Sequence, residues 1–174
     1  MCGKQYTKTV AYYKASNIKL SKTAYTYNGK VQKPSVTVKD SKGKTLKKGT
    51  DYTVSYSSGC KNVGRYTVKV TLKGNYSGSK SMTYNINPKG TSVSKVTAAK
   101  KGFKVTWKKQ ASQTSGYEVQ FTTSSNFKKG NKTVNITKNK TTSKSVSKPS
   151  AKKKYYVRVR TYKTVKVNGK NVKL

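Results

Sequence analysis

The segment RYTVKVTLK, residues 65–73, shows most clearly which fold this sequence encodes. Every second side chain from Tyr66 to Leu72 is apolar, and the residues between them are polar or basic. A period of two is typical of a β-strand with one buried face, because successive side chains in a strand point to opposite sides. We therefore predict a strand whose outer face is basic and carries Arg65, Lys69 and Lys73.

The same alternation recurs along the chain, and turn-forming residues separate the alternating segments. Asn28-Gly29 and Asn168-Gly169 are dipeptides that favour tight turns, and Asp40 to Gly43 is a further turn signal. No segment shows a sustained helical period. Short strands at a spacing of roughly 8–12 residues, with turns between them, are typical of β-sandwiches. The sequence thus predicts an all-β chain.

The pattern breaks once, at Asn87-Pro88-Lys89-Gly90, which is the clearest linker signal in the chain. Alternating segments resume beyond it. We predict a lead-in over residues 1–15, a β-sandwich over 16–88, a linker over 89–92 and a second β-sandwich over 93–174.

The charge of the chain is extreme, because 40 Lys and Arg residues face only three Asp and Glu residues, for a net charge of +37. High net charge with only 32% hydrophobic residues usually indicates disorder. The 14 Tyr residues and the strand periodicity argue instead for folded modules. All but three of the basic residues are Lys, whose mobile point charge suits dense anionic polymers better than shaped ligands.

The sequence offers little for catalysis. It has no His, which excludes His-based triads and His metal sites, and its only acids are Asp40, Asp51 and Glu118. Asp40 and Asp51 flank one apparent hairpin, where turn formation explains them best. Glu118 lies between Tyr117 and Val119, so its side chain is expected to point outward. We expect a non-enzymatic protein with no cofactor and no metal.

Two cysteines, Cys2 and Cys60, leave open a disulfide or two unrelated thiols, and we favour the thiols. No stretch approaches the length of a transmembrane helix, and no signal peptide is visible. We expect an extracellular or cell-surface protein whose secretion signal, if it has one, lies outside this sequence. The oligomeric state is left open.

Residues 16–88 carry a set of motifs that resembles a bacterial immunoglobulin-like repeat, of a kind common in large surface proteins of Gram-positive gut anaerobes. The motifs are YTYNGK at 25–30, KPSVTVKD at 33–40, GTDYTVSY at 49–56, NVG at 62–64 and GNYSG at 74–78. The resemblance implies an immunoglobulin-like β-sandwich.

Residues 93–174 resemble a bacterial fibronectin type III module through VTW at 105–107, GYEVQ at 116–120 and YYVRVR at 155–160. The resemblance implies that Trp107 is a core residue and that Tyr155 is the buried corner tyrosine. Pro149 departs from the family, which usually has Leu six residues before that Tyr. The module also reaches only the hairpin where a last strand would start, so the chain looks like a fragment or the strand is supplied elsewhere.

The candidate site residues are the basic side chains on predicted outer strand faces, together with two tyrosines. Tyr156 and Tyr162 flank Arg158 and Arg160, and this stripe could stack on sugars or bases while holding anions; an ordinary sheet face explains it equally well. The predicted polyanion-binding residues are Arg65, Lys69, Lys73, Lys104, Lys108, Lys152, Lys153, Lys154, Arg158 and Arg160.

Three functions fit the sequence. The first is a surface adhesin that binds anionic polymers such as teichoic acids or sulfated or sialylated glycans. The second is a passive spacer repeat of a larger surface protein, which would not need a charge of +37. The third is a nucleic-acid binder or an engineered supercharged scaffold; non-specific binding of DNA at low salt is expected of any chain this basic.

Overall fold

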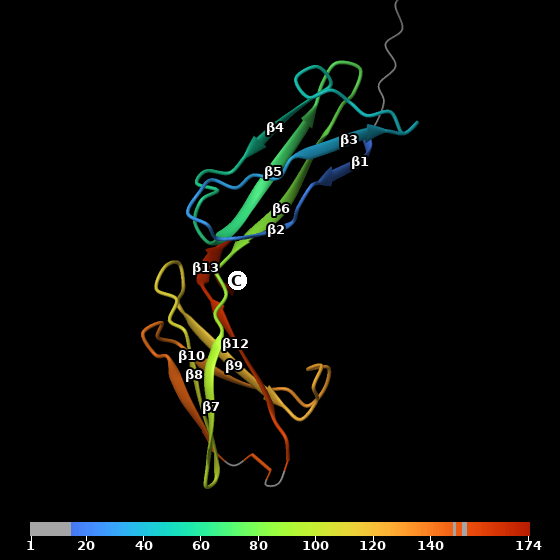
Figure 1. The fold of residues 1–174 in the computed structure, drawn as a ribbon. Helices are drawn as coiled ribbons and strands as arrows, with labels where there is room; N and C mark the ends of the chain where they lie inside the picture. The colour runs from blue at the N-terminus through green and yellow to red at the C-terminus, as the bar shows by residue number, and fades with distance from the viewer. Residues whose placement is uncertain (1–14, 148, 151–152) are drawn as a thin grey trace, which may run out of the picture. The chain divides into compact units, whose positions relative to one another are not determined.

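The computed structural model describes residues 15–147, 149–150 and 153–174, and it is an all-β structure (Figure 1). The predicted all-β class is confirmed. No helix in the described part of the chain has the length and apolar character needed to cross a membrane. The predicted lead-in lies almost entirely outside the described residues, as does Cys2.

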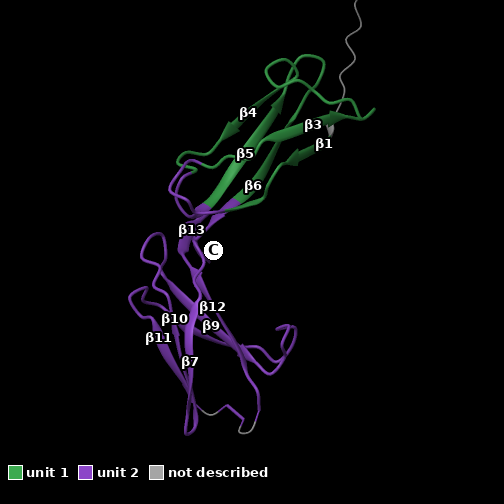
Figure 2. Ribbon diagram, viewed as in Figure 1, with its two compact units in different colours: residues 1–25, 32–60, 65–84 green, residues 26–31, 61–64, 85–174 purple. Residues whose placement is uncertain are grey.

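The chain divides into two compact units (Figure 2). The first comprises the described residues of 1–25 together with 32–60 and 65–84, and the second comprises 26–31, 61–64 and 85–174. Each unit is described by itself. The module borders expected at residues 88 and 93 stay predictions.

Six strands precede the predicted linker and form two sheets. The strands are β1 (Ala15–Leu20), β2 (Ala24–Thr26), β3 (Val36–Asp40), β4 (Tyr52–Tyr56), β5 (Gly64–Leu72) and β6 (Ser79–Asn87). β1 pairs antiparallel with β3, and the other four form a sheet in the order β2-β6-β5-β4. The alternation seen at residues 65–73 is therefore a strand at the centre of a sheet, as predicted.

Three tyrosines of the first unit lie in or beside its core and donate hydrogen bonds. Tyr52, Tyr56 and Tyr84 donate their hydroxyls to the carbonyl oxygens of Val36, Pro34 and Gln32, at 3.2, 2.6 and 2.8 Å. These contacts pin residues 32–36 to the four-stranded sheet and satisfy backbone acceptors in and just before β3. The high Tyr content thus has a structural cause.

The two acids of the first unit shape turns. Asp40 is buried, and its Oδ1 accepts hydrogen bonds of 2.9 Å from the backbone N–H groups of Lys42 and Lys44. Asp51 accepts from the backbone N–H of Lys47 at 2.7 Å. Both carboxylates therefore cap tight backbone turns, in agreement with the sequence interpretation.

Eight strands follow the predicted linker. They are β7 (Val93–Ala99), β8 (Gly102–Trp107), β9 (Gly116–Thr122), β10 (Lys132–Ile136), β11 (Ser143–Ser147), β12 (Tyr156–Tyr162), β13 (Thr164–Val167) and β14 (Lys170–Lys173). The sheet orders are β11-β8-β7 and β10-β9-β12, and β13 pairs with β14 in a hairpin. Asn168 and Gly169 both have positive φ, at 50° and 76°, which is what a two-residue hairpin turn requires.

The two three-stranded sheets of the second unit enclose one core and form a sandwich-like pair of layers. Trp107 and Phe103 from β8 pack against Tyr117 and Phe121 from β9, with ring centroids 5.4 and 5.6 Å apart. Trp107 is 3% exposed. Tyr155 is partly buried against the same core, and its hydroxyl accepts a hydrogen bond of 3.0 Å from the backbone N–H of Ser150.

Candidate polyanion-binding surface

The predicted basic residues of the first unit are exposed along β5. Arg65 and Lys69 lie on the outer side of the strand, and Lys73 follows its end. In the register with β4, Lys69 lies opposite Ser55, and the neighbouring pair is Thr71 with Thr53. On the β4 side, the side chain opposite Lys69 is therefore a short hydroxyl.

The predicted basic residues of the second unit lie on two opposite surfaces. Lys104 is exposed on β8, between the core residues Phe103 and Val105, and Lys108 follows the end of that strand. Arg158 and Arg160 are exposed on β12 in the other sheet. Because the two sheets face each other across the core, these pairs point in opposite directions. The predicted residues thus do not form one continuous site.

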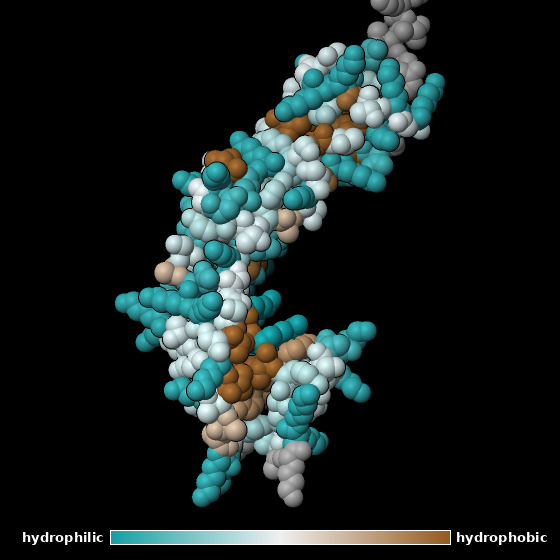
Figure 3. Space-filling view, viewed as in Figure 1, coloured by the Kyte–Doolittle hydropathy of each residue, from teal (hydrophilic) through white to brown (hydrophobic). Residues whose placement is uncertain are grey.

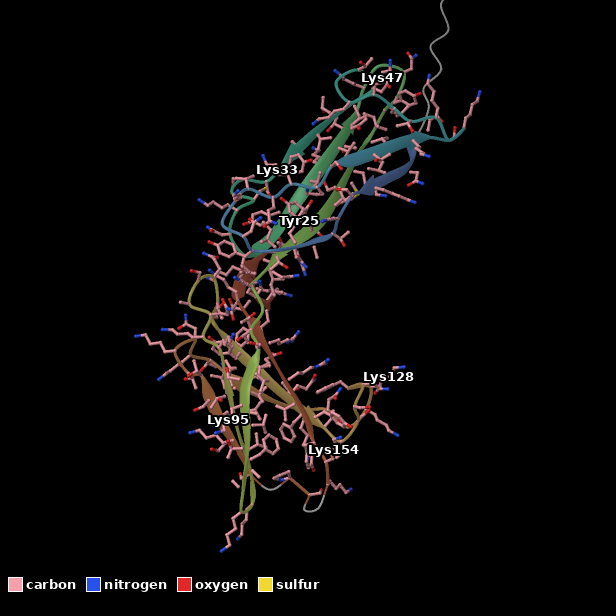
Figure 4. All side chains as sticks on the ribbon, in the orientation of Figure 1. Tyr25, Lys33, Lys47, Lys95, Lys128 and Lys154 are labelled. Atoms are coloured by element: carbon pink, nitrogen blue, oxygen red, sulfur yellow. The ribbon has the colours of Figure 1, made fainter. Side chains whose placement is uncertain are left out.

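The basic triplet before β12 is only partly described. Lys152 lies outside the described residues, whereas Lys153 and Lys154 are exposed. The ammonium group of Lys154 lies 5.3 Å from the centroid of the Tyr156 ring. A lysine of the protein itself therefore makes a cation–π contact with this ring. Lysine side chains project from opposite sides of the second unit, as the labelled Lys95 and Lys128 show (Figure 4).

The prediction that Tyr162 is available for stacking is wrong, because this residue is only 4% exposed. It lies opposite Gly116, where a Cβ atom would come within 2.8 Å of the Tyr162 hydroxyl. The ring occupies the space that the glycine leaves, and the hydroxyl donates to the backbone oxygen of Ile136 at 3.3 Å. The ammonium group of Lys173 covers the ring, 4.5 Å from its centroid.

The outer face of the β10-β9-β12 sheet carries a first transverse row of polar side chains. The register places Gln120 of β9 between Arg158 of β12 and Thr133 of β10. Arg158 donates from Nε to Gln120 Oε1 at 2.6 Å, and Gln120 donates from Nε2 to Thr133 Oγ1 at 3.3 Å. The guanidinium group of Arg158 is therefore held from one side by a side-chain amide.

A second row runs parallel to the first. Glu118 lies opposite Arg160 on one side and Asn135 on the other. Arg160 donates from Nε to Glu118 Oε2 at 2.5 Å, and Lys173 donates from Nζ to Glu118 Oε1 at 3.1 Å and to Asn135 Oδ1 at 2.8 Å. We call the two rows together the arginine face: Glu118, Gln120, Thr133, Asn135, Arg158, Arg160 and Lys173.

Glu118 is the one acid of the arginine face, and it is 8% exposed. Its side chain lies on the outer face, as expected, but Arg160 and Lys173 cover it. Burial alone would raise the pKa of the carboxyl, but hydrogen bonds from Lys173 and Arg160 and their positive charges outweigh this effect and lower the pKa. Glu118 is thus an anion that fixes two cations in place near neutral pH.

Arg158 has a second contact that holds its guanidinium plane. The Cζ atom lies 4.3 Å from the centroid of the Phe127 ring, which comes from the loop between β9 and β10. A hollow of about 480 Å³ lies beside it, lined by Glu118, Gln120, Thr133, Arg158 and Arg160. With three cations and one carboxylate, the arginine face has a net charge of two positive units.

The sequence interpretation missed the residues that organise this face. Gln120, Thr133 and Asn135 become partners of the arginines only through the pairing of β9 with β10 and β12. Lys173 arrives through the β13-β14 hairpin, and Phe127 through a loop with a positive φ of 54°. The sequence offered one signal. Glu118 and Gln120 can both accept hydrogen bonds and are two residues apart, which is also the spacing of Arg158 and Arg160.

Neither a protein-family model nor a curated protein matches the chain. Its function is therefore inferred from the arrangement of its own side chains.

Proposed function

We propose that this protein is a non-catalytic, secreted or cell-surface module that binds anionic polymers through the arginine face, and that the remaining lysines provide a general attraction. The observation that carries the proposal is the fixed position of Arg158. Its Nε is 2.6 Å from Gln120 Oε1, and its Cζ atom lies 4.3 Å from the Phe127 ring centroid. An arginine oriented in this way loses little side-chain entropy when it binds an anion.

The proposed anion contact uses the N–H groups that Arg158 does not spend on Gln120. A guanidinium group has five N–H donors in a planar fork, and only the Nε donor is directed at the amide. The remaining donors suit the paired oxygens of a sulfate, phosphate or carboxylate group. Arg160 is neutralised in part by Glu118, so it serves mainly to keep the field of the face positive.

The groups beside Arg158 favour a polymer that contains sugars. Gln120 and Thr133 offer an amide and a hydroxyl along the same hollow, which match the hydroxyls of a saccharide chain. Teichoic acids and sulfated or sialylated glycans combine such hydroxyls with anionic groups. The net charge of +37 would concentrate these polymers near the protein at low salt.

We propose that the two units are an immunoglobulin-like and a fibronectin type III-like module. The second assignment is supported by Trp107 in the core and by the hydrogen bond from Ser150 to the Tyr155 hydroxyl, which ties a tyrosine back to the backbone five residues upstream. Modules of this kind suit a surface or secreted protein, which is the location we propose.

The test is binding to heparin, sulfated mucin, teichoic acid and duplex DNA at rising salt. We expect one sugar polymer to stay bound above about 0.15 M ionic strength, where DNA is released. The Arg158→Ala/Arg160→Ala variant should lose this difference, and a Lys104→Ala/Lys108→Ala variant, which removes the same charge, should keep it. Release of all four polymers together, with both variants alike, would show that charge alone acts and would favour a spacer.

A further inference from the structure

The hollow of about 480 Å³ in the arginine face differs from the rest of the basic surface in the hydrogen-bonding groups that line it. Figure 3 shows hydrophilic side chains over most of the visible surface of both units. Because most of the basic residues are lysines spread along the chain, attraction to anions is general. Charge alone therefore does not select one anionic group over another, whereas hydrogen-bonding groups in a hollow can do so.

The acceptor oxygens that line the hollow are already engaged. Both carboxylate oxygens of Glu118 accept hydrogen bonds from cationic side chains. Gln120 Oε1 accepts from Arg158, and the Oγ1 of Thr133 accepts from Gln120. A ligand group that must donate a hydrogen bond therefore meets acceptors that already have a partner in the protein.

Donors of the same residues have no acceptor in the described part of the chain. Arg158 uses Nε for Gln120 and leaves both Nη groups unused. Arg160 uses Nε and Nη2 for Glu118 and leaves Nη1 unused. The Thr133 hydroxyl accepts from Gln120 and donates to none of the described residues. The hollow thus offers unused donors beside acceptors that are engaged.

The spacing of the two arginines suits a small anion that lies between them. Arg158 and Arg160 are two residues apart on β12, so their side chains share one face of the sheet and start about 7 Å apart. Gln120 and Glu118 lie opposite them on β9, and Thr133 of β10 lies opposite Gln120. An anion in the hollow therefore has guanidinium donors on its β12 side and the Thr133 hydroxyl on its β10 side.

The polymers proposed above carry three kinds of anionic group. A sulfate ester projects from its sugar and has three terminal oxygens, none of which carries a proton. A carboxylate has two such oxygens. The phosphodiester of a teichoic acid lies within the polymer backbone, so it cannot enter a hollow as an end group. A hollow lined by unused donors between two arginines therefore matches a projecting sulfate best.

We propose that the hollow of the arginine face binds a sulfate ester of a glycan and prefers this group to carboxylates and phosphodiesters. Two sulfate oxygens accept from the Nη groups of Arg158 and Arg160, and the third accepts from the Thr133 hydroxyl. The sugar that carries the sulfate stays outside the hollow. This selectivity rests on the polymer-binding role proposed above and narrows that role to one anionic group.

The first test compares polymers that carry the same number of anionic groups per unit length. Dextran sulfate and carboxymethyl dextran share a backbone, and poly(glycerol phosphate) supplies phosphodiesters within its chain. Binding of the full chain is measured by calorimetry at about 0.15 M ionic strength, where general attraction is screened. We expect dextran sulfate to bind about fivefold more tightly than either of the other two polymers, because it accepts one more hydrogen bond.

A second comparison keeps both charge and shape constant. At about pH 5 a phosphate monoester carries mainly one negative charge, as a sulfate ester does, but one of its oxygens is protonated and donates. Glu118 stays ionised at this pH because its pKa is lowered. Dextran phosphate should therefore bind about threefold more weakly than dextran sulfate at this pH, since its P–OH group meets engaged acceptors.

The third test changes the protein. The preference for dextran sulfate over carboxymethyl dextran should fall to within about twofold in Arg158→Ala/Arg160→Ala and persist in Lys104→Ala/Lys108→Ala, which removes the same charge. Thr133→Val removes the third donor and should reduce the preference about threefold, whereas Thr133→Ser keeps the hydroxyl and should retain it.

Two results would overturn the sulfate proposal and leave the polymer-binding role intact. One is equal affinity for dextran sulfate and carboxymethyl dextran when Arg158→Ala/Arg160→Ala weakens the binding of both. The other is a sulfate preference that persists in this double variant, which would place the preference in the lysine coat. If the two double variants bound every polymer alike, the polymer-binding role of the arginine face would itself be contradicted.

Discussion

Two strands of this protein have the same sequence pattern and different surroundings. β5 carries Arg65 and Lys69 on its outer face, and β12 carries Arg158 and Arg160 on its own. Across from Lys69 lies a serine, so the neighbouring strand offers its amine no long acceptor. Across from the β12 arginines lie Gln120 and Glu118, which reach both guanidinium groups.

The difference shows that the side chains opposite a basic strand decide whether its charged groups are held in place. On the β4 side of β5, Lys69 faces the short hydroxyl of Ser55, which suits attraction that depends on charge and little on shape. On β12 the charge is held at a known position and orientation. The substitutions proposed below each change one of the side chains that hold the β12 arginines or the arginines themselves, and β5 serves as the reference.

The largest expected effect is on stability. Glu118→Gln should lower the free energy of unfolding of the second unit by about 1–3 kcal/mol near neutral pH, because it removes the negative charge and replaces one of the two accepting oxygens by an NH2 donor. Trp107 is the one Trp of the chain and lies in the second core, so its fluorescence during urea unfolding follows this unit. Asp51→Asn in the first unit is the matched control and should leave the Trp107 signal unchanged.

The effect of Glu118→Gln should also depend on pH. The folded-state pKa of Glu118 is lowered, so its contribution to stability is complete above the ordinary glutamate pKa of about 4.3 and disappears as the pH falls through the lowered value. The unfolding midpoints of the wild type and variant should therefore converge below about pH 4. A constant difference from pH 7 to pH 3 would contradict this assignment.

A smaller effect is expected at Phe127. Phe127→Leu removes the ring that lies 4.3 Å from the Arg158 guanidinium and should weaken binding of the preferred polymer about two- to fivefold. Phe127→Tyr keeps a ring at the same position and should retain the affinity. If Leu and Tyr gave the same result, the ring would have no role in orienting Arg158.

Much of the fold could be predicted from the sequence, because local patterns carry it. Residues 65–73 alternate and form a strand, and Asn168-Gly169 forms the expected hairpin. Asn28-Gly29 has the same composition but lies in a longer loop, where the Asn28 side chain accepts from the backbone N–H of Lys30 at 2.9 Å. The dipeptide favours a turn, and the partners of the flanking residues decide whether a hairpin results.

The candidate site could be predicted only in part, because it depends on strand register. Alternation places Arg158 and Arg160 outward, and the structure agrees. The same rule places Tyr162 outward. Gly116 lies opposite and has no side chain, so the Tyr162 ring can pack over it against the sheet. Likewise, nothing local in the sequence brings Lys173 to Glu118, since 55 residues separate them.

The most direct test of the central claim changes arginine geometry and keeps charge constant. Arg158→Lys/Arg160→Lys retains both positive charges but loses the planar fork, while Arg65→Lys makes the same replacement on β5. We expect the double variant to lose about tenfold in affinity for the salt-resistant polymer at about 0.15 M ionic strength, and Arg65→Lys to bind like the wild type. If both variants bound as tightly as the wild type, the charge of the chain alone would account for binding, and the arginine face would not be a site.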